Sequence, residues 1–134
     1  MKKIIALTLA IILCMLSIPA HANEVSVSPY YIRIRLMTHE FHINEQKGRA
    51  VVGAEMDIKS GSYCTISAKI QRETDSGWVT VTTYRAVGGT SALIEETPTL
   101  TSGYNYKCTF TFTVYDEYDM IIEQKAFSEE ADYT

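Results

Sequence analysis

From residue 30 onward, apolar and polar side chains alternate along most of the chain, which is the period-two pattern of strands that bury one face. The pattern predicts seven strands, which cover residues 30–36, 50–58, 64–71, 78–84, 92–96, 104–115 and 120–127. The longest of these places a large apolar side chain or a cysteine at every second position from Tyr104 to Val114. Helical periodicity is hard to find in the same region, so the pattern indicates an all-β fold.

Short polar segments separate the predicted strands. Residues with turn chemistry gather at 59–62, 74–77, 88–89 and 116–119, and Pro98 ends the fifth strand. About seven strands at this spacing predict one β-sandwich domain over residues 30–127, preceded by a lead-in at 23–29. The acidic end, residues 128–134, is expected to fray.

The first 22 residues show the three zones of a secretory signal peptide. Two lysines give a positive start, residues 4–18 are an apolar run, and Ala20 and Ala22 are the small residues that signal peptidase requires. The apolar run is shorter than the roughly 20 residues of a membrane span, although a retained anchor is the alternative. The pattern predicts cleavage between Ala22 and Asn23, and a secreted, extracellular domain with no membrane anchor.

The net charge of the chain indicates which classes of partner it can bind. The chain carries 12 basic and 16 acidic residues, and loss of the two lysines of the signal leaves a domain more acidic than the net −4 of the whole chain. An acidic domain gains nothing from phosphate backbones or from anionic lipid surfaces. We therefore expect neither nucleic acid nor a membrane surface as a partner.

Two cysteines, Cys64 and Cys108, remain once the signal is removed. An even number of cysteines in an exported chain is typical of a disulfide, because the outside of the cell does not reduce thiols. A bridge between them would close a loop of about 44 residues and contribute about 4 kcal/mol in the chain-entropy account. Two buried free thiols are the alternative.

The segment from residue 100 to residue 106 resembles the LxxGxxY start of strand F in fibronectin type III and related immunoglobulin-like domains. Leu100, Gly103 and Tyr106 occupy the three marked positions. In that family the glycine permits a corner, and the tyrosine hydroxyl bonds back to the preceding backbone. Residues 66–78, which end with Trp78, are similar to the C–C′ hairpin of the same family. The resemblance covers roughly residues 63–127 and implies a single immunoglobulin-like sandwich.

Within that framework Cys64 falls on strand C and Cys108 on strand F, so the bridge would join neighbouring strands of one sheet. If the labels slip by one strand, it becomes the inter-sheet bridge between strands B and F. The chain as a whole also resembles short secreted proteins of unknown function from Gram-positive gut bacteria. That second resemblance implies a compartment and a fold but no activity.

No set of residues carries the pattern of a catalytic, cofactor-binding or metal site. His39 and His42 point to opposite faces of a strand and cannot easily converge on a metal, so we interpret both as exposed edge residues. The acidic segment 116–119 matches no calcium loop, and no serine or cysteine lies in a nucleophile-elbow context. We therefore predict a domain that is not an enzyme and needs no cofactor.

The strongest candidate for binding is an aromatic and acidic turn, with the connection around Gly88-Gly89 as a second surface. The turn consists of Tyr115, Asp116, Glu117, Tyr118 and Asp119. Aromatic side chains on loops cost little entropy to immobilise, and carboxylates accept directional hydrogen bonds. We therefore predict a binding or adhesion module for a protein or a glycan outside the cell. The alternative is a structural or assembly role in the cell envelope, in which exposed strand edges pair with other chains.

Overall fold

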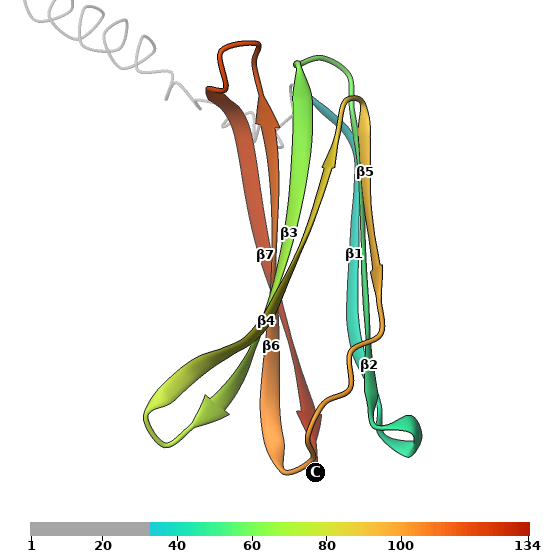
Figure 1. The fold of residues 1–134 in the computed structure, drawn as a ribbon, viewed down its shortest axis with the longest axis vertical. Helices are drawn as coiled ribbons and strands as arrows, with labels where there is room; N and C mark the ends of the chain where they lie inside the picture. Colours follow the sequence, from blue (N-terminus) through green and yellow to red (C-terminus); the bar gives the residue numbers. More distant parts are fainter. Residues whose placement is uncertain (1–32) are drawn as a thin grey trace, which may run out of the picture. The chain divides into compact units, whose positions relative to one another are not determined.

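The computed structural model describes residues 33–134, which form a sandwich of two antiparallel sheets (Figure 1). The first sheet has the order β1-β2-β5 and consists of β1 (Ile34–Asn44), β2 (Arg49–Ile58) and β5 (Ser91–Glu96). The second has the order β4-β3-β6-β7 and consists of β3 (Tyr63–Thr74), β4 (Gly77–Gly88), β6 (Tyr104–Tyr115) and β7 (Ile121–Tyr133). One turn of 3-10 helix, η1 (Glu45–Lys47), joins β1 to β2.

The predicted fold class, an all-β sandwich of about seven strands, is confirmed. The predicted signal peptide at 1–22 and lead-in at 23–29 lie outside the described residues.

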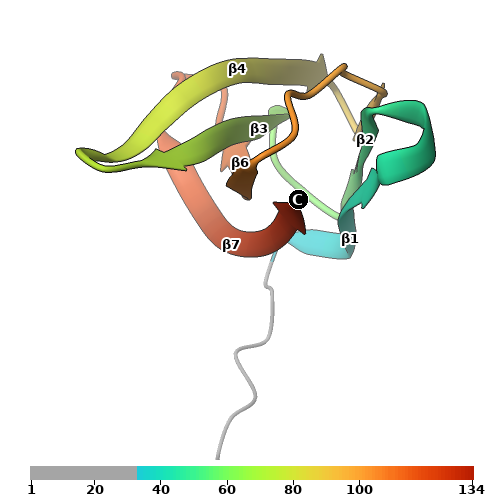
Figure 2. The same ribbon diagram turned by 90° about the horizontal axis from the view of Figure 1, so that it is seen from below.

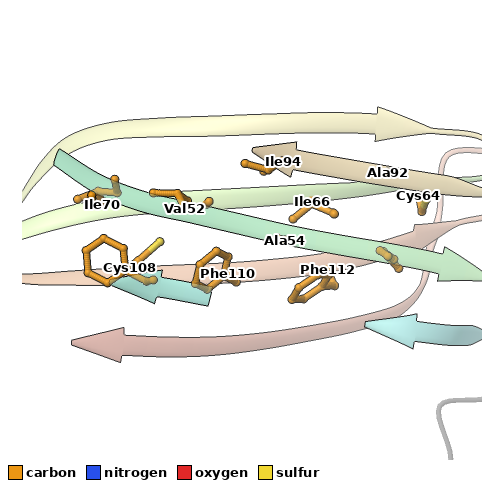
Figure 3. Packing of buried hydrophobic residues seen from close by; sticks show 14 of the residues in the cluster. Val52, Ala54, Cys64, Ile66, Ile70, Ala92, Ile94, Cys108, Phe110 and Phe112 are labelled. Atoms are coloured by element: carbon orange, nitrogen blue, oxygen red, sulfur yellow. The ribbon is translucent and has the colours of Figure 1, made fainter. Parts of the chain in front are cut away.

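The core lies between the sheets and follows the alternation of the sequence. Every second residue is buried from Ala50 to Ile58, from Cys64 to Ile70 and from Tyr106 to Val114, and Figure 3 shows side chains of this cluster meeting between the layers. Burial of each large apolar side chain contributes about 1.5–3 kcal/mol. The largest fully buried side chains are Tyr106, Phe110, Phe112, Met56, Ile66, Ile70, Val52, Val114, Cys64 and Cys108.

The first strand differs from its prediction in its length and in which of its side chains point toward the core. It runs to Asn44 rather than ending at residue 36, and its pairing with β2 shifts register between Ile34 and Leu36. An extra residue in a strand inverts the alternation beyond it. Ile34 is therefore buried, Leu36 is exposed, and the inward positions become Met37, His39 and Phe41.

The predicted disulfide is absent because of strand register. Cys64 and Cys108 do lie on neighbouring strands, but Cys64 is opposite Val114 and Cys108 is opposite Ile70. Six positions therefore separate them along the sheet, which corresponds to about 20 Å. A disulfide needs Cα atoms within about 7 Å, so the prediction is wrong and both residues are free, buried thiols (Figure 3).

The predicted boundary after residue 127 is also wrong. Residues 128–133 continue β7 and pair with β6 as far as Tyr133 opposite Tyr104. Ala131 and Tyr133 pack against the core, and this burial holds the acidic end in the sheet. The sandwich therefore extends to Tyr133 rather than ending in a frayed tail.

Candidate functional site

The predicted binding turn joins β6 to β7 at one end of the sandwich. Figure 1 shows the β2–β3 and β4–β5 connections at this same end. Backbone hydrogen bonds link the connections to neighbouring strands: the Ser62 amide donates to the Tyr115 carbonyl at 2.8 Å, and the Ile58 amide donates to the Thr90 carbonyl at 2.9 Å. The surfaces at Gly88-Gly89 and at the acidic turn therefore share one end of the domain.

Asp116 shapes the turn from inside. Its Oδ1 accepts hydrogen bonds from the amides of Tyr118 and Met120, both at 2.9 Å. Its backbone closes the same turn, because the Asp116 amide donates to the Met120 carbonyl at 3.0 Å. Asp119 adopts a left-handed conformation with φ of 61°, which aspartate tolerates better than most residues. The Asp116 carboxylate is thus used within the protein, and it is a structural residue of the turn.

A second set of contacts fixes the turn to the start of β3. The Tyr115 and Tyr63 rings are stacked, with centroids 4.6 Å apart and an interplanar angle of 6°. The Tyr63 hydroxyl donates to Oδ1 of Asp119 at 3.0 Å. Desolvation, followed by the hydrogen bond and charge of Asp119, raises the pKa of Tyr63 and keeps its hydroxyl a donor. Two of the three predicted acidic residues therefore hold the turn, and Glu117 is left exposed.

Four exposed apolar side chains lie at the turn and in the first residues of β7. Tyr118 is 77% exposed, Met120 63% and Ile121 54%, and the neighbouring Ile122 is also exposed. We call these four residues the tip patch. Of these four residues, the sequence pattern predicted only Tyr118 as part of a binding turn, because Met120 was assigned to the following strand. The signal was present as three consecutive apolar residues, 120–122, which interrupt the alternation.

The predicted corner lies at the opposite end of β6. The Tyr106 hydroxyl donates to the Thr101 carbonyl at 2.7 Å and accepts the Thr101 amide at 3.1 Å. Gly103 has φ of 89°, a conformation that favours glycine, and Leu100 is buried. The geometry is that of a tyrosine corner, with the ring buried and only its hydroxyl used for bonding.

The two histidines occupy opposite faces of β1, as predicted, but only His42 is exposed. His39 points inward, where its ring stacks on Phe110 and Phe127 at centroid distances of 5.2 and 4.9 Å. Its Nδ1 bonds to the Glu129 carboxylate of β7. The prediction of an exposed His39 is therefore wrong, because the bulge after Ile34 turns this part of β1 inward.

Glu129 also supports the edge of the first sheet. Its Oε2 accepts the Phe41 amide at 3.0 Å, and farther along β7 Glu123 accepts the Arg33 amide at 2.7 Å. Figure 2 shows β7 curving round to lie beside β1. Backbone donors in β1 and directly before it are thus occupied by carboxylates of the other sheet.

Within residues 33–134, histidine, cysteine and acidic side chains form no group of three or more that could hold a metal ion. The same part of the chain contains no helix long and apolar enough to cross a membrane.

Comparisons with protein-family models, curated proteins and solved structures all return no match.

Proposed function

We propose that this protein is a secreted, non-enzymatic binding module that recognises another protein through its tip patch. The observation that carries the proposal is the exposure of four apolar side chains between residues 118 and 122, at a turn that hydrogen bonds hold in place and at the start of β7. Water disfavours such a cluster, and contiguous exposed apolar surface marks interaction sites. A rigid turn loses little conformational entropy on binding.

The chemistry around the patch favours a protein partner with a basic rim. Glu117 is exposed beside Tyr118, and the domain carries excess negative charge. An apolar centre with charges at its margin is the usual anatomy of a protein interface. Phosphate backbones and anionic lipids would be repelled by the same charges.

An immunoglobulin-like topology is part of this proposal. The strand orders β1-β2-β5 and β4-β3-β6-β7 support it, since they place the predicted C, C′ and F strands side by side. The bonds between Tyr106 and Thr101 support it as well. Such domains use loops at one end of the sandwich for recognition, while the sheets supply the scaffold.

Export is the second component of the proposal, and N-terminal sequencing tests it. Protein recovered from culture medium should begin at Asn23, because the alanines at 20 and 22 fit the specificity of signal peptidase. A secreted protein that still begins at Met1 would contradict the assigned cleavage.

Recognition by the tip patch is tested by a pair of matched substitutions. We expect the double change Tyr118→Ser and Ile121→Ser to reduce capture of envelope or host-surface proteins at least about tenfold, since two anchor side chains are lost. The control is Leu93→Ser, which removes an apolar side chain of similar exposure from β5. Equal capture by all three proteins, with unchanged melting temperatures, would overturn the assignment of the tip.

The assembly role through strand edges has its own supporting observation, at β4. This strand is the outer edge of the second sheet, and residues 77–84 carry no charged side chain. Val79 and Val81 are exposed there. A Val81→Lys change should abolish self-association measured by light scattering if β4 pairs with other chains, because a lysine on an edge blocks pairing. A wild-type protein that is monomeric at high concentration would exclude this role in self-association.

A further inference from the structure

The outer face of the four-stranded sheet carries a shallow hollow that is separate from the tip patch. Its volume is about 320 Å³, at the lower end of the range for small-molecule sites. Its floor is four hydroxyl-bearing residues on the two central strands, with Thr65 opposite Thr113 and Ser67 opposite Thr111. Directly opposed side chains are about 5 Å apart, and neighbours along a strand on the same face are about 7 Å apart. The four hydroxyl-bearing residues thus form an array of about the dimensions of one sugar ring, in which Thr65 and Thr113 are buried and Ser67 and Thr111 are partly exposed.

The walls of the hollow supply an aromatic ring, an amide and a cation. Tyr115 lies at one end, where its ring is fixed by stacking on Tyr63. Gln124 of β7 donates to the Thr113 hydroxyl at 3.0 Å. On the β4 side, Arg85 lies next to Ser67 in the register. Tyr115, Gln124 and Arg85 therefore surround the hydroxyl array on three sides.

Most of this hydrogen-bonding capacity is unused. Within residues 33–134, the hydroxyls of Ser67 and Thr111 make no side-chain hydrogen bond, and the Arg85 guanidinium makes no hydrogen bond or ion pair. By contrast, Arg35 on the other sheet is paired with Asp57 at 3.0 Å. The residues that line the hollow include no carboxylate. A guanidinium without an acidic neighbour in an acidic protein is available to an anion from outside.

The opposite face of the sandwich shows the complementary charge pattern. A hollow on the outer face of the first sheet is lined by the carboxylates of Glu40, Glu55 and Glu95. An acidic ligand is repelled there and attracted to Arg85. The charge distribution thus directs a small anion to one face of the domain.

We infer that the hollow binds a sugar acid, that is, a pyranose ring that carries a carboxylate. The carboxylate pairs with the Arg85 guanidinium, for which a bidentate contact is the favoured geometry. Ring hydroxyls exchange hydrogen bonds with the partly exposed Ser67 and Thr111 hydroxyls, each of which donates and accepts. The apolar face of the sugar lies against Tyr115. The ligand is either a free sugar acid or a uronate residue of a longer glycan.

Chemical-shift titration of the ¹⁵N-labelled exported protein tests this inference. D-galacturonate should give saturable shifts at the amides of Thr65, Ser67 and Thr111, and D-galactose, which lacks the carboxylate, should bind at least about tenfold more weakly. An oligogalacturonate distinguishes the two sources: tighter binding than the monomer identifies a glycan, and equal or weaker binding identifies a free sugar acid.

Two variants make the test specific. Arg85→Gln should weaken galacturonate binding at least about tenfold with an otherwise unchanged spectrum, because Arg85 is exposed. Arg35→Gln, which removes an arginine from the other face, should leave binding within twofold of wild type. The inference is overturned if galacturonate causes no shifts, if galactose binds equally well, or if Arg85→Gln binds like wild type. A Tyr118→Ser variant, whose residue does not line the hollow, should bind galacturonate normally, so this outcome is independent of the proposed protein partner.

Discussion

The Tyr106 hydroxyl makes both of its hydrogen bonds to one residue, donating to the carbonyl of Thr101 and accepting from its amide. The ring is 1% exposed, so neither bond is easily replaced by water. This pair fixes the chain where it enters β6.

We expect Tyr106→Phe to lower the free energy of unfolding by about 1–2 kcal/mol, because the ring stays packed while both bonds are lost. Urea denaturation followed by circular dichroism measures the change. Tyr104→Phe is the control, since the Tyr104 hydroxyl makes no hydrogen bond within the described residues, and it should cost less than about 0.5 kcal/mol. Equal effects from both changes would argue against a stabilising corner.

Thiol titration tests the register of the cysteines. Exported protein that is denatured without a reducing agent should show two free sulfhydryls, one each from Cys64 and Cys108. The native protein should react with neither at pH 8, because both side chains are fully buried. If denatured, unreduced protein contained no titratable thiol, the two strands would have to pair in a different register.

Alkaline pH should destabilise the protein partly through Cys108. Burial, with a smaller contribution from Glu129, raises the pKa of Cys108 to about 12 from the ordinary value of 9.0. The unfolded chain therefore releases this proton at lower pH than the folded protein. The protonated Cys108 thiol therefore favours the folded state. This contribution to the free energy of unfolding is fully present below about pH 9 and is lost as pH rises toward 12.

A comparison with Cys108→Ala isolates this effect. Between pH 9 and 11 the unfolding free energy of the wild type should fall more steeply than that of the variant, by at most about 1.4 kcal/mol per pH unit. Urea denaturation at half-unit pH intervals measures the two slopes. Parallel slopes would show that the folded-state pKa of Cys108 is not raised.

Glu129→Ala should destabilise the sandwich by about 1–3 kcal/mol, since it leaves the Phe41 amide and the His39 ring without their partner. Glu130→Ala is a matched control on the next residue, which is exposed, and it should change stability by less than about 0.5 kcal/mol. Thermal unfolding of the two variants gives the comparison. Similar melting temperatures for both would contradict a role for Glu129 in joining the sheets.

The alternation of the sequence was sufficient to predict which apolar side chains of β2, β3 and β6 are buried, although Thr65 and Thr113 on the other face are buried as well. Those strands are central, and a central strand must direct its apolar face to the core. The LxxGxxY spacing was sufficient for the corner, because that bond is local and joins residues five positions apart.

The errors have a common cause, which is contact between segments far apart in the sequence. The distance between Cys64 and Cys108 depends on the register of β3 against β6, and this register cannot be predicted from the sequence of either strand alone. His39 is inward because of a bulge against β2, and residues 128–133 are ordered because β6 lies beside them. The hollow was missed for the same reason, since Arg85, Ser67 and Thr111 belong to three different strands.

The C-terminus lies at the end of the sandwich opposite the tip patch (Figure 1). Between them β7 spans 13 residues, a length of about 40 Å. If Thr134 were attached to a surface, the long axis of the sandwich would therefore point away from that surface. The β2–β3, β4–β5 and β6–β7 turns would then all lie at the end farthest from it. Immobilisation through this end gives every molecule on a sensor surface the same orientation.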